Sequence, residues 1–333
     1  MANDITIVAL DAMGGDFAPA EQVKGAVEAI NENSNIFVKL VGQEDKIQAE
    51  LDKYQFDHGR IEIVNATEVI ETSESPVKAI KSKKDSSMVK ALYLVHDGEA
   101  DAIVSCGNTG ALLVGGQVIV GRIKGIERPA LGFVVPTLKG PCMIIDCGAN
   151  VDARPEMLVQ FAKMGSIYMK NIVKIDNPRV GIVSIGEEEE KGNALVKETH
   201  PLLKECEGLN FVGNIESRQI TDGDADIAVC DAFVGNIILK MYEGVCKALL
   251  AEIKGALMTN LKTKIGALLI KKDLKKTLKT FSIEEYGGAP LLGLNNLVVK
   301  AHGNSKAVEI KNAIVQCEEF KNNDISGKIS ENL

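Results

Sequence analysis

Short apolar runs alternate with amphipathic segments along the whole chain. The first run, residues 5–10, leads through a glycine turn into apolar residues at helical spacing, which are Val23, Ala26, Val27 and Ile30. Several runs are rich in Val and Ile on both faces, which is typical of strands that helices cover on both sides. We therefore predict an α/β fold of three layers, α/β/α, with a mostly parallel sheet.

This pattern places the expected elements along the chain. Strands are expected at residues 5–10, 36–41, 61–64, 102–105, 131–135, 143–146, 180–185, 227–230 and 297–301. Helices are expected at residues 20–31, 86–96, 109–119, 156–168, 193–206 and 305–320, among others. The chain has no repeat, low-complexity tract or Pro/Ser-rich linker, so we expect a single large domain over residues 1–333.

Polar, glycine-containing loops follow many of these strands. They are residues 11–16, 105–110, 146–150, 186–193, 231–236 and 302–305. Ligands of open α/β sheets bind at the carboxyl ends of strands. Glycines at a strand-to-helix junction also let backbone N–H groups approach an anion. We expect these loops to form one shared anion site, although none matches a dinucleotide fingerprint or a P-loop.

Three side chains in these loops could act on a ligand alongside the backbone N–H groups. His302 ends an apolar strand before Gly303, where it can donate to an anion or act as an acid or base. Lys191 follows four consecutive Glu, which are expected to point to solvent, and it can turn inward as a point charge. Asn236 can hold an acyl or phosphate oxygen, with Lys240 one helical turn further on. For each residue, a capping or solvated side chain is the alternative.

Composition excludes several other functions. The net charge of −8 and the aromatic content of 4%, without Trp, argue against nucleic-acid binding. The seven cysteines are scattered and form no C-x-x-C pair, so neither a disulfide framework nor a metal site is expected. No signal peptide or membrane-spanning apolar run is found, which predicts a cytoplasmic protein.

One segment departs from the acidic composition of the chain. Residues 254–279 hold eight lysines and one aspartate, a net charge of +7. Their apolar residues follow helical spacing, and Gly255 and Gly266 are expected to bend or divide the segment. Such a basic amphipathic segment can lie on an anionic membrane, or it can pack its apolar face against a second subunit. The residues expected to make these contacts are Leu257, Leu261, Ile265, Lys271, Lys272, Lys275 and Lys276.

Several of these motifs together resemble one family, the acyl-acyl carrier protein:phosphate acyltransferases of bacterial phospholipid synthesis. The matching segments are residues 9–16, 106–112, 146–150, 185–193, 233–236 and 286–293, in family order. The most specific are Ala-Leu-Asp-Ala-Met-Gly-Gly-Asp at residues 9–16 and Tyr-Gly-Gly-Ala-Pro-Leu-Leu-Gly at residues 286–293. The chain departs from the family pattern at residues 214–219, at Ala232 and at residues 295–296.

This resemblance implies a reaction and a setting. A long-chain acyl group would pass from acyl carrier protein to inorganic phosphate, giving acyl phosphate for phosphatidic acid synthesis without a cofactor or metal. The resemblance also implies an isocitrate/isopropylmalate dehydrogenase-like fold and a homodimer. A helical protrusion over residues 245–285 would touch the inner face of the cell membrane, where a downstream membrane acyltransferase resides.

For such a reaction, we hypothesise roles for the residues of the expected site. Phosphate would be bound by the loops at residues 11–16, 105–110 and 186–193. The binding residues would be Gly14, Gly15, Asp16, Asn108, Thr109, Gly110 and Asn193. Among these residues, Asp16 would mainly orient its loop. Lys191 and His302 would supply charge, and Asn236 would hold the thioester oxygen.

Three alternatives stay open at this point. The first is a short-chain acyl-CoA phosphate acyltransferase on the same fold. The second is a metal- and NAD-dependent decarboxylating dehydrogenase, for which the alternating Asp222, Asp224 and Asp226 would be the metal ligands. The third is a non-catalytic membrane-binding scaffold, which rests only on the lysine-rich segment.

Overall fold

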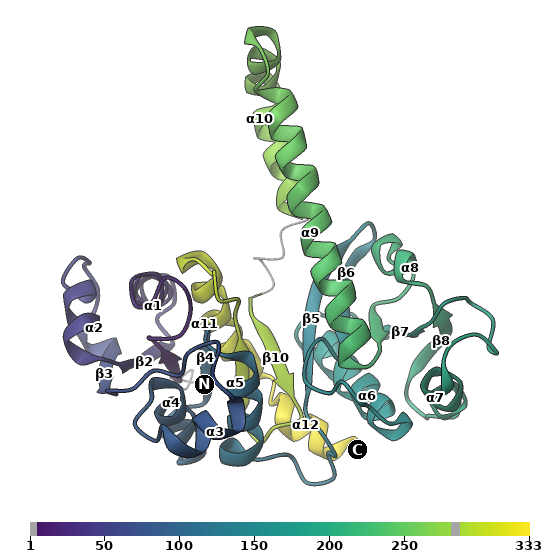
Figure 1. The fold of residues 1–333 in the computed structure, drawn as a ribbon, viewed down its shortest axis with the longest axis horizontal. Coiled ribbons are helices and arrows are strands. Elements are labelled where there is room, and N and C mark those ends of the chain that lie inside the picture. Colours follow the sequence, from purple (N-terminus) through teal and green to yellow (C-terminus); the bar gives the residue numbers. More distant parts are fainter. Residues whose placement is uncertain (1–4, 281–286) are drawn as a thin grey trace.

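One continuous sheet runs through the body of the molecule (Figure 1). The computed structural model describes residues 5–280 and 287–333. Within them the strand order is β3-β2-β1-β4-β11-β10-β5-β6-β9-β7-β8. The strands are β1 (Thr6–Asp11), β2 (Ile36–Gly42), β3 (Ile61–Asn65), β4 (Ala102–Ser105), β5 (Ala130–Thr137), β6 (Gly140–Ile145), β7 (Arg179–Val183), β8 (Asn210–Ile215), β9 (Ile227–Val229), β10 (Ala289–Leu292) and β11 (Leu297–Lys300).

Helices cover both faces of this sheet. They are α1 (Ala20–Glu32), α2 (Glu44–Leu51), α3 (Pro76–Ser82), α4 (Ser87–His96), α5 (Thr109–Gly115), α6 (Pro155–Asn171), α7 (Ala194–Lys204), α8 (Ser217–Asp222), α9 (Ala232–Leu257), α10 (Leu261–Thr280), α11 (Ala307–Asn322) and α12 (Ile325–Glu331). One core layer contains Ile30, Phe161 and Ile314 from α1, α6 and α11. The other contains Leu92 and Leu112 from α4 and α5. The predicted α/β class with a large, mostly parallel sheet is confirmed.

The sheet consists of two parallel groups that run in opposite directions. Strands β3, β2, β1, β4 and β11 form the first group, and β6, β9, β7 and β8 form the second. Between them, β10 pairs antiparallel with β11 and with β5, and β5 pairs antiparallel with β6. Three reversals of direction separate the groups. Their carboxyl ends therefore do not form one row along a single sheet edge, contrary to the expectation for the six loops.

Two helices project from the body as a hairpin (Figure 1). Helix α9 extends to Leu257, and α10 starts at Leu261 after a short turn, in which Asn260 Oδ1 accepts a hydrogen bond from the Thr263 N–H at 3.1 Å. The predicted division at Gly255 and Gly266 is wrong, because both glycines lie within helices. Residues 281–285 of the predicted protrusion lie outside the described residues.

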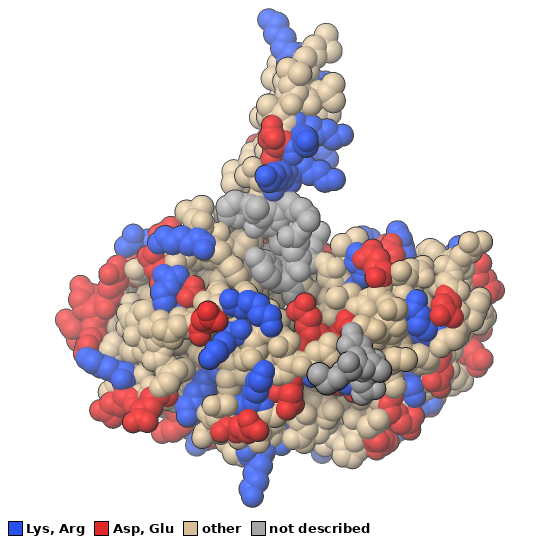
Figure 2. Space-filling model, turned by 180° about the vertical axis from the view of Figure 1, so that it is seen from behind, with Lys and Arg blue, Asp and Glu red and all other residues tan. Residues whose placement is uncertain are grey.

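The hairpin exposes both charge and apolar surface. Figure 2 shows lysine side chains gathered on it, away from the mixed charges of the body. Between them, the side chains of Leu261, Ile265, Leu268 and Leu269 are exposed. Neither hairpin helix, nor any other helix in the described part of the chain, is long and apolar enough to cross a membrane.

Candidate functional site

The carboxyl ends of β1 and β4 are joined by a relay of hydrogen bonds. Asp11 and Ser105 are register partners at these ends, and the Ser105 hydroxyl donates to Asp11 Oδ2 at 2.6 Å. The same hydroxyl oxygen accepts a hydrogen bond from the Gly107 N–H at 3.0 Å. Burial raises the pKa of the Asp11 carboxyl, while the hydrogen bonds from Ser105 and other neighbours oppose that rise. Asp11 therefore organises both loops from beneath, out of contact with solvent.

Two glycines let these loops approach each other closely. A Cβ on Gly14 would lie 2.5 Å from Asp11 Oδ2 and 2.7 Å from the Gly107 nitrogen. Gly15 has a φ of +102°, and a Cβ there would lie 2.9 Å from the carbonyl oxygen of Gly303. Only glycine fits both positions without displacement of its neighbours. The structure thus brings together the predicted loops at Gly14 and Gly107 with the loop that follows β11.

The loop after β11 completes this first group. The backbone N–H of Asp16 donates to the Gly303 carbonyl at 2.7 Å, so this loop and the loop after β11 are joined through the main chain. His302 Nε2 lies 2.9 Å from Glu243 Oε1 on α9, and the imidazole ring meets Phe133 edge-on with centroids 5.8 Å apart. The His302 side chain is 39% exposed, so it is held in place yet open to a ligand.

Asn108 has a different role from the predicted side-chain phosphate donor. Its Nδ2 donates to the carbonyl oxygens of Glu71, Thr72 and Glu74, each at 3.1 Å. Its Oδ1 caps α5 by accepting from the Ala111 N–H at 2.9 Å. Because both the nitrogen and the oxygen of its side-chain amide form hydrogen bonds within the protein, Asn108 positions its loop. Contact with an anion is left to backbone N–H groups, including those of Thr109 and Gly110, which are partly exposed.

Cys106 lies in the same loop and could be mistaken for a nucleophile. Burial raises the pKa of its thiol to about 12. The reactive form of cysteine is the thiolate, which this environment disfavours. Cys106 therefore packs as a small apolar group beside Gly15.

The second group of loops surrounds the start of α9. The buried Asp146 carboxylate accepts hydrogen bonds from the N–H groups of Leu131, Gly148, Ala149 and Asn150. Asn150 in turn accepts one through its carbonyl from the Ala232 N–H at 2.9 Å. These bonds fix the first turn of α9, and Asn236 in the next turn is exposed.

Lys191 belongs to this second group. Its loop follows β7, which lies next to β9 in the sheet, and the four preceding Glu are exposed as predicted. Lys191 lines an open depression of about 590 Å³ together with Ile185, Gly186, Glu187, Glu188 and Glu216. Asn193 is the N-cap of α7, because its Oδ1 accepts from the Val196 N–H at 3.0 Å. The Asn193 side chain therefore already caps this helix, and a phosphate contact would have to be made in addition.

Two residues missed in the sequence support the Lys191 loop. The buried His200 ring donates from Nδ1 to Asn214 Oδ1, 2.9 Å away. The Asn214 amide donates to the Glu188 carbonyl at 2.7 Å. Residues 214–219, where the chain departs from the family pattern, are thus the end of β8 and the first half of α8 and not an open loop.

Helix α9 connects the two groups. It begins beside Asp146, and a Cβ on Gly235 would collide with the Asp146 carbonyl oxygen. Further along, Lys240 pairs with Glu243 at 3.0 Å, and Glu243 contacts His302. Seven residues separate Asn236 from Glu243, a rise of about 10 Å along a helix. Asn236 therefore lies about 10 Å along the helix axis from the residue that contacts His302.

A mostly buried lysine at the first group was not predicted from the sequence. Lys300 is the last residue of β11 and the register partner of Ser105. In the sequence it is only a polar residue at the end of an apolar strand, two residues before His302. Its position beside Asp11 and Cys106 depends on the strand order, which the sequence does not show.

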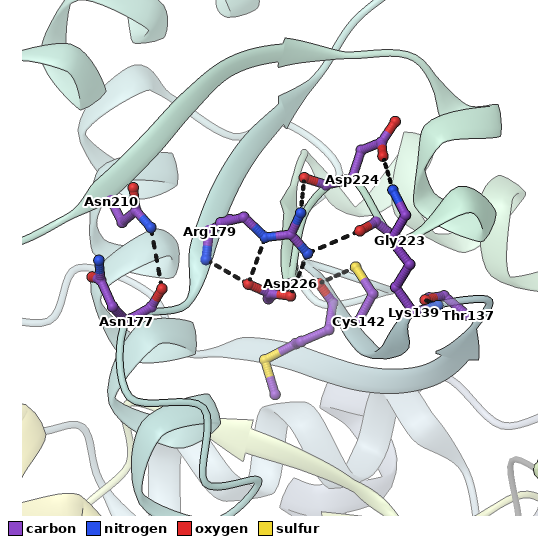
Figure 3. A network of polar contacts seen from close by, with 10 residues as sticks. Thr137, Lys139, Cys142, Asn177, Arg179, Asn210, Gly223, Asp224 and Asp226 are labelled. Atoms are coloured by element: carbon purple, nitrogen blue, oxygen red, sulfur yellow. Dashed lines mark hydrogen bonds and ion pairs between the residues drawn. The ribbon is translucent and has the colours of Figure 1, made fainter.

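Two of the three aspartates of the dehydrogenase alternative, Asp224 and Asp226, are already paired with basic side chains (Figure 3). The Asp226 carboxylate accepts two hydrogen bonds from the Arg179 guanidinium, at 3.1 and 2.8 Å, at the amino ends of β9 and β7. Asp224 binds Lys139 Nζ at 2.7 Å, which lowers the pKa of Asp224. No group of three or more His, Cys, Asp or Glu suited to a metal ion occurs in the described ranges. This cluster is a structural ion-pair network.

Comparison with known proteins identifies the class. A family described as "Fatty acid synthesis protein" matches residues 6–328. A phosphate acyltransferase of Clostridium botulinum is 54% identical over 323 residues, covering 97% of each chain. A phosphate acyltransferase of Clostridium acetobutylicum is 51% identical over 327 residues, covering 98% of each chain. The protein is an acyltransferase. Within that class, the chain belongs to the phosphate acyltransferase family, as its motifs predicted.

Solved structures support the fold. A phosphotransacetylase from Streptococcus pyogenes aligns with a TM-score of 0.60 and 18% identity, over 96% of this chain and 94% of that one. The EutD phosphotransacetylase from Staphylococcus aureus aligns with a TM-score of 0.59 and 17% identity, over 95% and 94%. At this level of identity, the likeness concerns the fold alone.

Proposed function

We propose that this phosphate acyltransferase transfers a long-chain acyl group from acyl carrier protein to inorganic phosphate. The observation that carries the proposal is the set of three loops at the ends of β1, β4 and β11, which Asp11, Ser105 and Gly303 hold together. Backbone N–H groups of Gly14, Gly15, Thr109 and Gly110 bind the phosphate there. Asn108 and Asp16 position these loops.

The reaction needs no nucleophile from the protein. A phosphate oxygen of HPO₄²⁻ attacks the thioester carbonyl, the new C–O bond forms and the C–S bond breaks. The phosphate gives up its proton, and the leaving thiolate takes one up, so acyl phosphate and a thiol result. The raised pKa of the Cys106 thiol agrees with a reaction in which cysteine stays protonated.

The remaining task is to hold both reactants and to stabilise developing charge. Asn236 binds the thioester oxygen through its amide, which is worth roughly 3–4 kcal/mol for one oxyanion donor. His302, oriented by Glu243, supplies positive charge or a proton near the phosphate. Lys191 supplies charge from the loop after β7, and Asn193 contributes the N-terminus of α7.

The hairpin of α9 and α10 provides the contacts outside the site. The exposed Leu261 and Ile265, with Leu257 beside them, pack against a second copy of this chain, which gives a homodimer. Lys271, Lys272, Lys275 and Lys276 attract the anionic inner face of the cell membrane, where a downstream membrane acyltransferase takes the product. The protein is then cytoplasmic and peripherally bound.

The fold assignment belongs to the same proposal. It comprises a single large domain over residues 1–333, an isocitrate/isopropylmalate dehydrogenase-like arrangement and an inserted protrusion over residues 245–285. The continuous sheet across both parallel groups supports one domain.

One assay series tests the proposed residues. Lys191→Ala and Asn236→Ala should each lower acyl phosphate formation at least about tenfold, because each removes a group that meets charge in the transition state. Asn322→Ala, on the surface at the end of α11, is the matched control and should retain full activity. Full activity in both site variants would contradict the assignment.

A further inference from the structure

Lys300 lies among the strand ends that form the proposed phosphate site. Lys300 of β11, Ser105 of β4 and Asp11 of β1 follow one another in register across three neighbouring strands. Val298, two residues before Lys300, belongs to the core layer under α4 and α5. Because side chains alternate between the faces of a strand, Lys300 points toward that same layer, as Asp11 does.

This ammonium group is mostly buried without a close counter-charge. Its hydrogen bond goes to the carbonyl of the adjacent Ala301. Among the described residues, Asp11 and Asp16 are near enough to act on Lys300 electrostatically, but neither forms an ion pair with it. Asp11 is engaged by Ser105, while Lys240, another cation nearby, is paired with Glu243. A buried charge without a partner costs stability, and a bound anion would offset that cost.

The electrostatic environment agrees with this picture. Burial lowers the pKa of Lys300 below its usual value of 10.5, and Cys106, Asp11 and Asp16 oppose that shift only in part. Lys240 lowers the pKa further by like-charge repulsion. An anion bound at the strand ends would relieve both effects, because it would supply negative charge to two neighbouring cations.

We infer that the Lys300 ammonium binds the phosphate nucleophile from beneath, opposite the backbone N–H groups of the loops at Gly14 and Gly107. This inference rests on the proposed function, because it concerns the anion of that site. HPO₄²⁻ supplies the counter-charge that Lys300 lacks, and the ammonium donates to one phosphate oxygen while another attacks the thioester. A phosphate ester in the acyl donor would have the same chemistry, and the test must separate these two sources.

The test compares Lys300→Met with Lys39→Met. Lys39 is also a mostly buried lysine within the sheet, but it pairs with Glu62 and Glu99 away from the strand ends. Lys300→Met should raise the KM for phosphate by about tenfold to a hundredfold and leave the KM for acyl carrier protein within about twofold. Lys300→Arg keeps the charge and should recover part of the loss, and Lys39→Met should change neither constant.

A second readout does not depend on acyl transfer. Added phosphate should raise the melting temperature of the wild-type protein, because a ligand that binds only the folded state stabilises it. Lys300→Met should lose this rise and, without phosphate, melt at the same temperature or higher, since an unpaired buried charge is removed. A merely structural lysine would instead give a lower melting temperature. Lys300→Gln serves for the same comparison if the Met variant does not fold.

The outcomes separate this inference from the proposed function. If phosphate stabilises the wild type through Lys300 but no acyl phosphate forms, the inference holds and the proposed function fails. If the wild type makes acyl phosphate while Lys300→Met keeps the phosphate KM and the phosphate-dependent melting shift, the inference is overturned. A raised KM for the acyl carrier protein with an unchanged KM for phosphate would also overturn it, in favour of the donor's phosphate ester.

Discussion

His302 Nε2 lies 2.9 Å from Glu243 Oε1, and this contact joins the loop after β11 to the middle of α9. It links the loops at the ends of β1, β4 and β11 to the helix whose second turn begins at Asn236. Phe133 borders the same imidazole edge-on, so the ring is fixed by one polar and one aromatic neighbour. The orientation of His302 is therefore set before any substrate binds, which reduces the cost of ordering it in the transition state.

Removal of the His302 imidazole should lower kcat more than it changes the KM values of the substrates. His302→Ala should lower kcat by roughly 10²- to 10³-fold, the usual effect of losing one charge-stabilising group. Steady-state kinetics with varied phosphate and acyl donor would measure it. His96→Ala, at the exposed end of α4, is the control and should be unaffected. A His302→Ala enzyme with kcat within about twofold of the wild type would refute the role.

Glu243 should contribute stability that depends on pH. Burial opposes its ionisation, but hydrogen bonds from His302 and Lys240 outweigh burial and lower the pKa of Glu243 below 4.5. A carboxyl group with a lowered folded-state pKa stabilises the fold above its unfolded value, and this contribution is lost as pH falls through the folded pKa. Glu243→Gln should therefore unfold more easily at neutral pH and lose less stability on acidification. Urea unfolding of both proteins between about pH 7 and pH 3 checks this, and parallel stability profiles would count against it.

Gly14 should tolerate no side chain. Gly14→Ala would place a methyl group against Asp11 Oδ2 and the Gly107 nitrogen, and such overpacking typically costs about 1–3 kcal/mol. The displaced loop should also lose phosphate-dependent stabilisation. Gly255→Ala is the matched control, because a Cβ there meets no neighbouring atom, and alanine in a helix should raise stability slightly. Thermal unfolding with and without phosphate measures both effects; equal behaviour of the two variants would show that the close approach at Gly14 is unimportant.

The lysines of α10 should govern membrane binding. Replacement of Lys271, Lys272, Lys275 and Lys276 by Glu should release the protein from anionic vesicles, since each lysine near such a surface contributes about 1 kcal/mol. Flotation with vesicles of anionic and of neutral lipid would measure it. Reversal of Lys46, Lys53, Lys81 and Lys84, which are exposed on the body, is the control. If the α10 variant still bound anionic vesicles as well as the wild type, these lysines would not be the cause of membrane binding.

The local pattern of the chain predicted most strands well, and the exceptions have physical reasons. Strand β8 was missed because Asn210–Ile215 is polar and partly exposed at the sheet edge, so it lacks a continuous apolar run. Strand β10 was missed because it is four residues long and contains a proline. The turn between α9 and α10 was misplaced, since Asn260 caps the second helix while Gly255 remains helical.

The candidate site was predictable only in part. Glycine turns after apolar runs are local features, so the loops at Gly14 and Gly107 were found from the sequence. Which loops meet depends on strand directions, and the reversals at β10 and β5 come from long-range pairing. The roles of Asn108 and Lys300 depend on the same order, because their neighbours are distant in the chain.

The most direct measurement combines the purified protein with long-chain acyl carrier protein and inorganic phosphate, and traps the product with hydroxylamine as a hydroxamate. Acetyl-CoA replaces the carrier in a parallel reaction. We expect acyl phosphate to form only when inorganic phosphate is present. It should form far faster from the long-chain carrier than from acetyl-CoA. Faster turnover of acetyl-CoA, or no trapped product from the carrier, would contradict it.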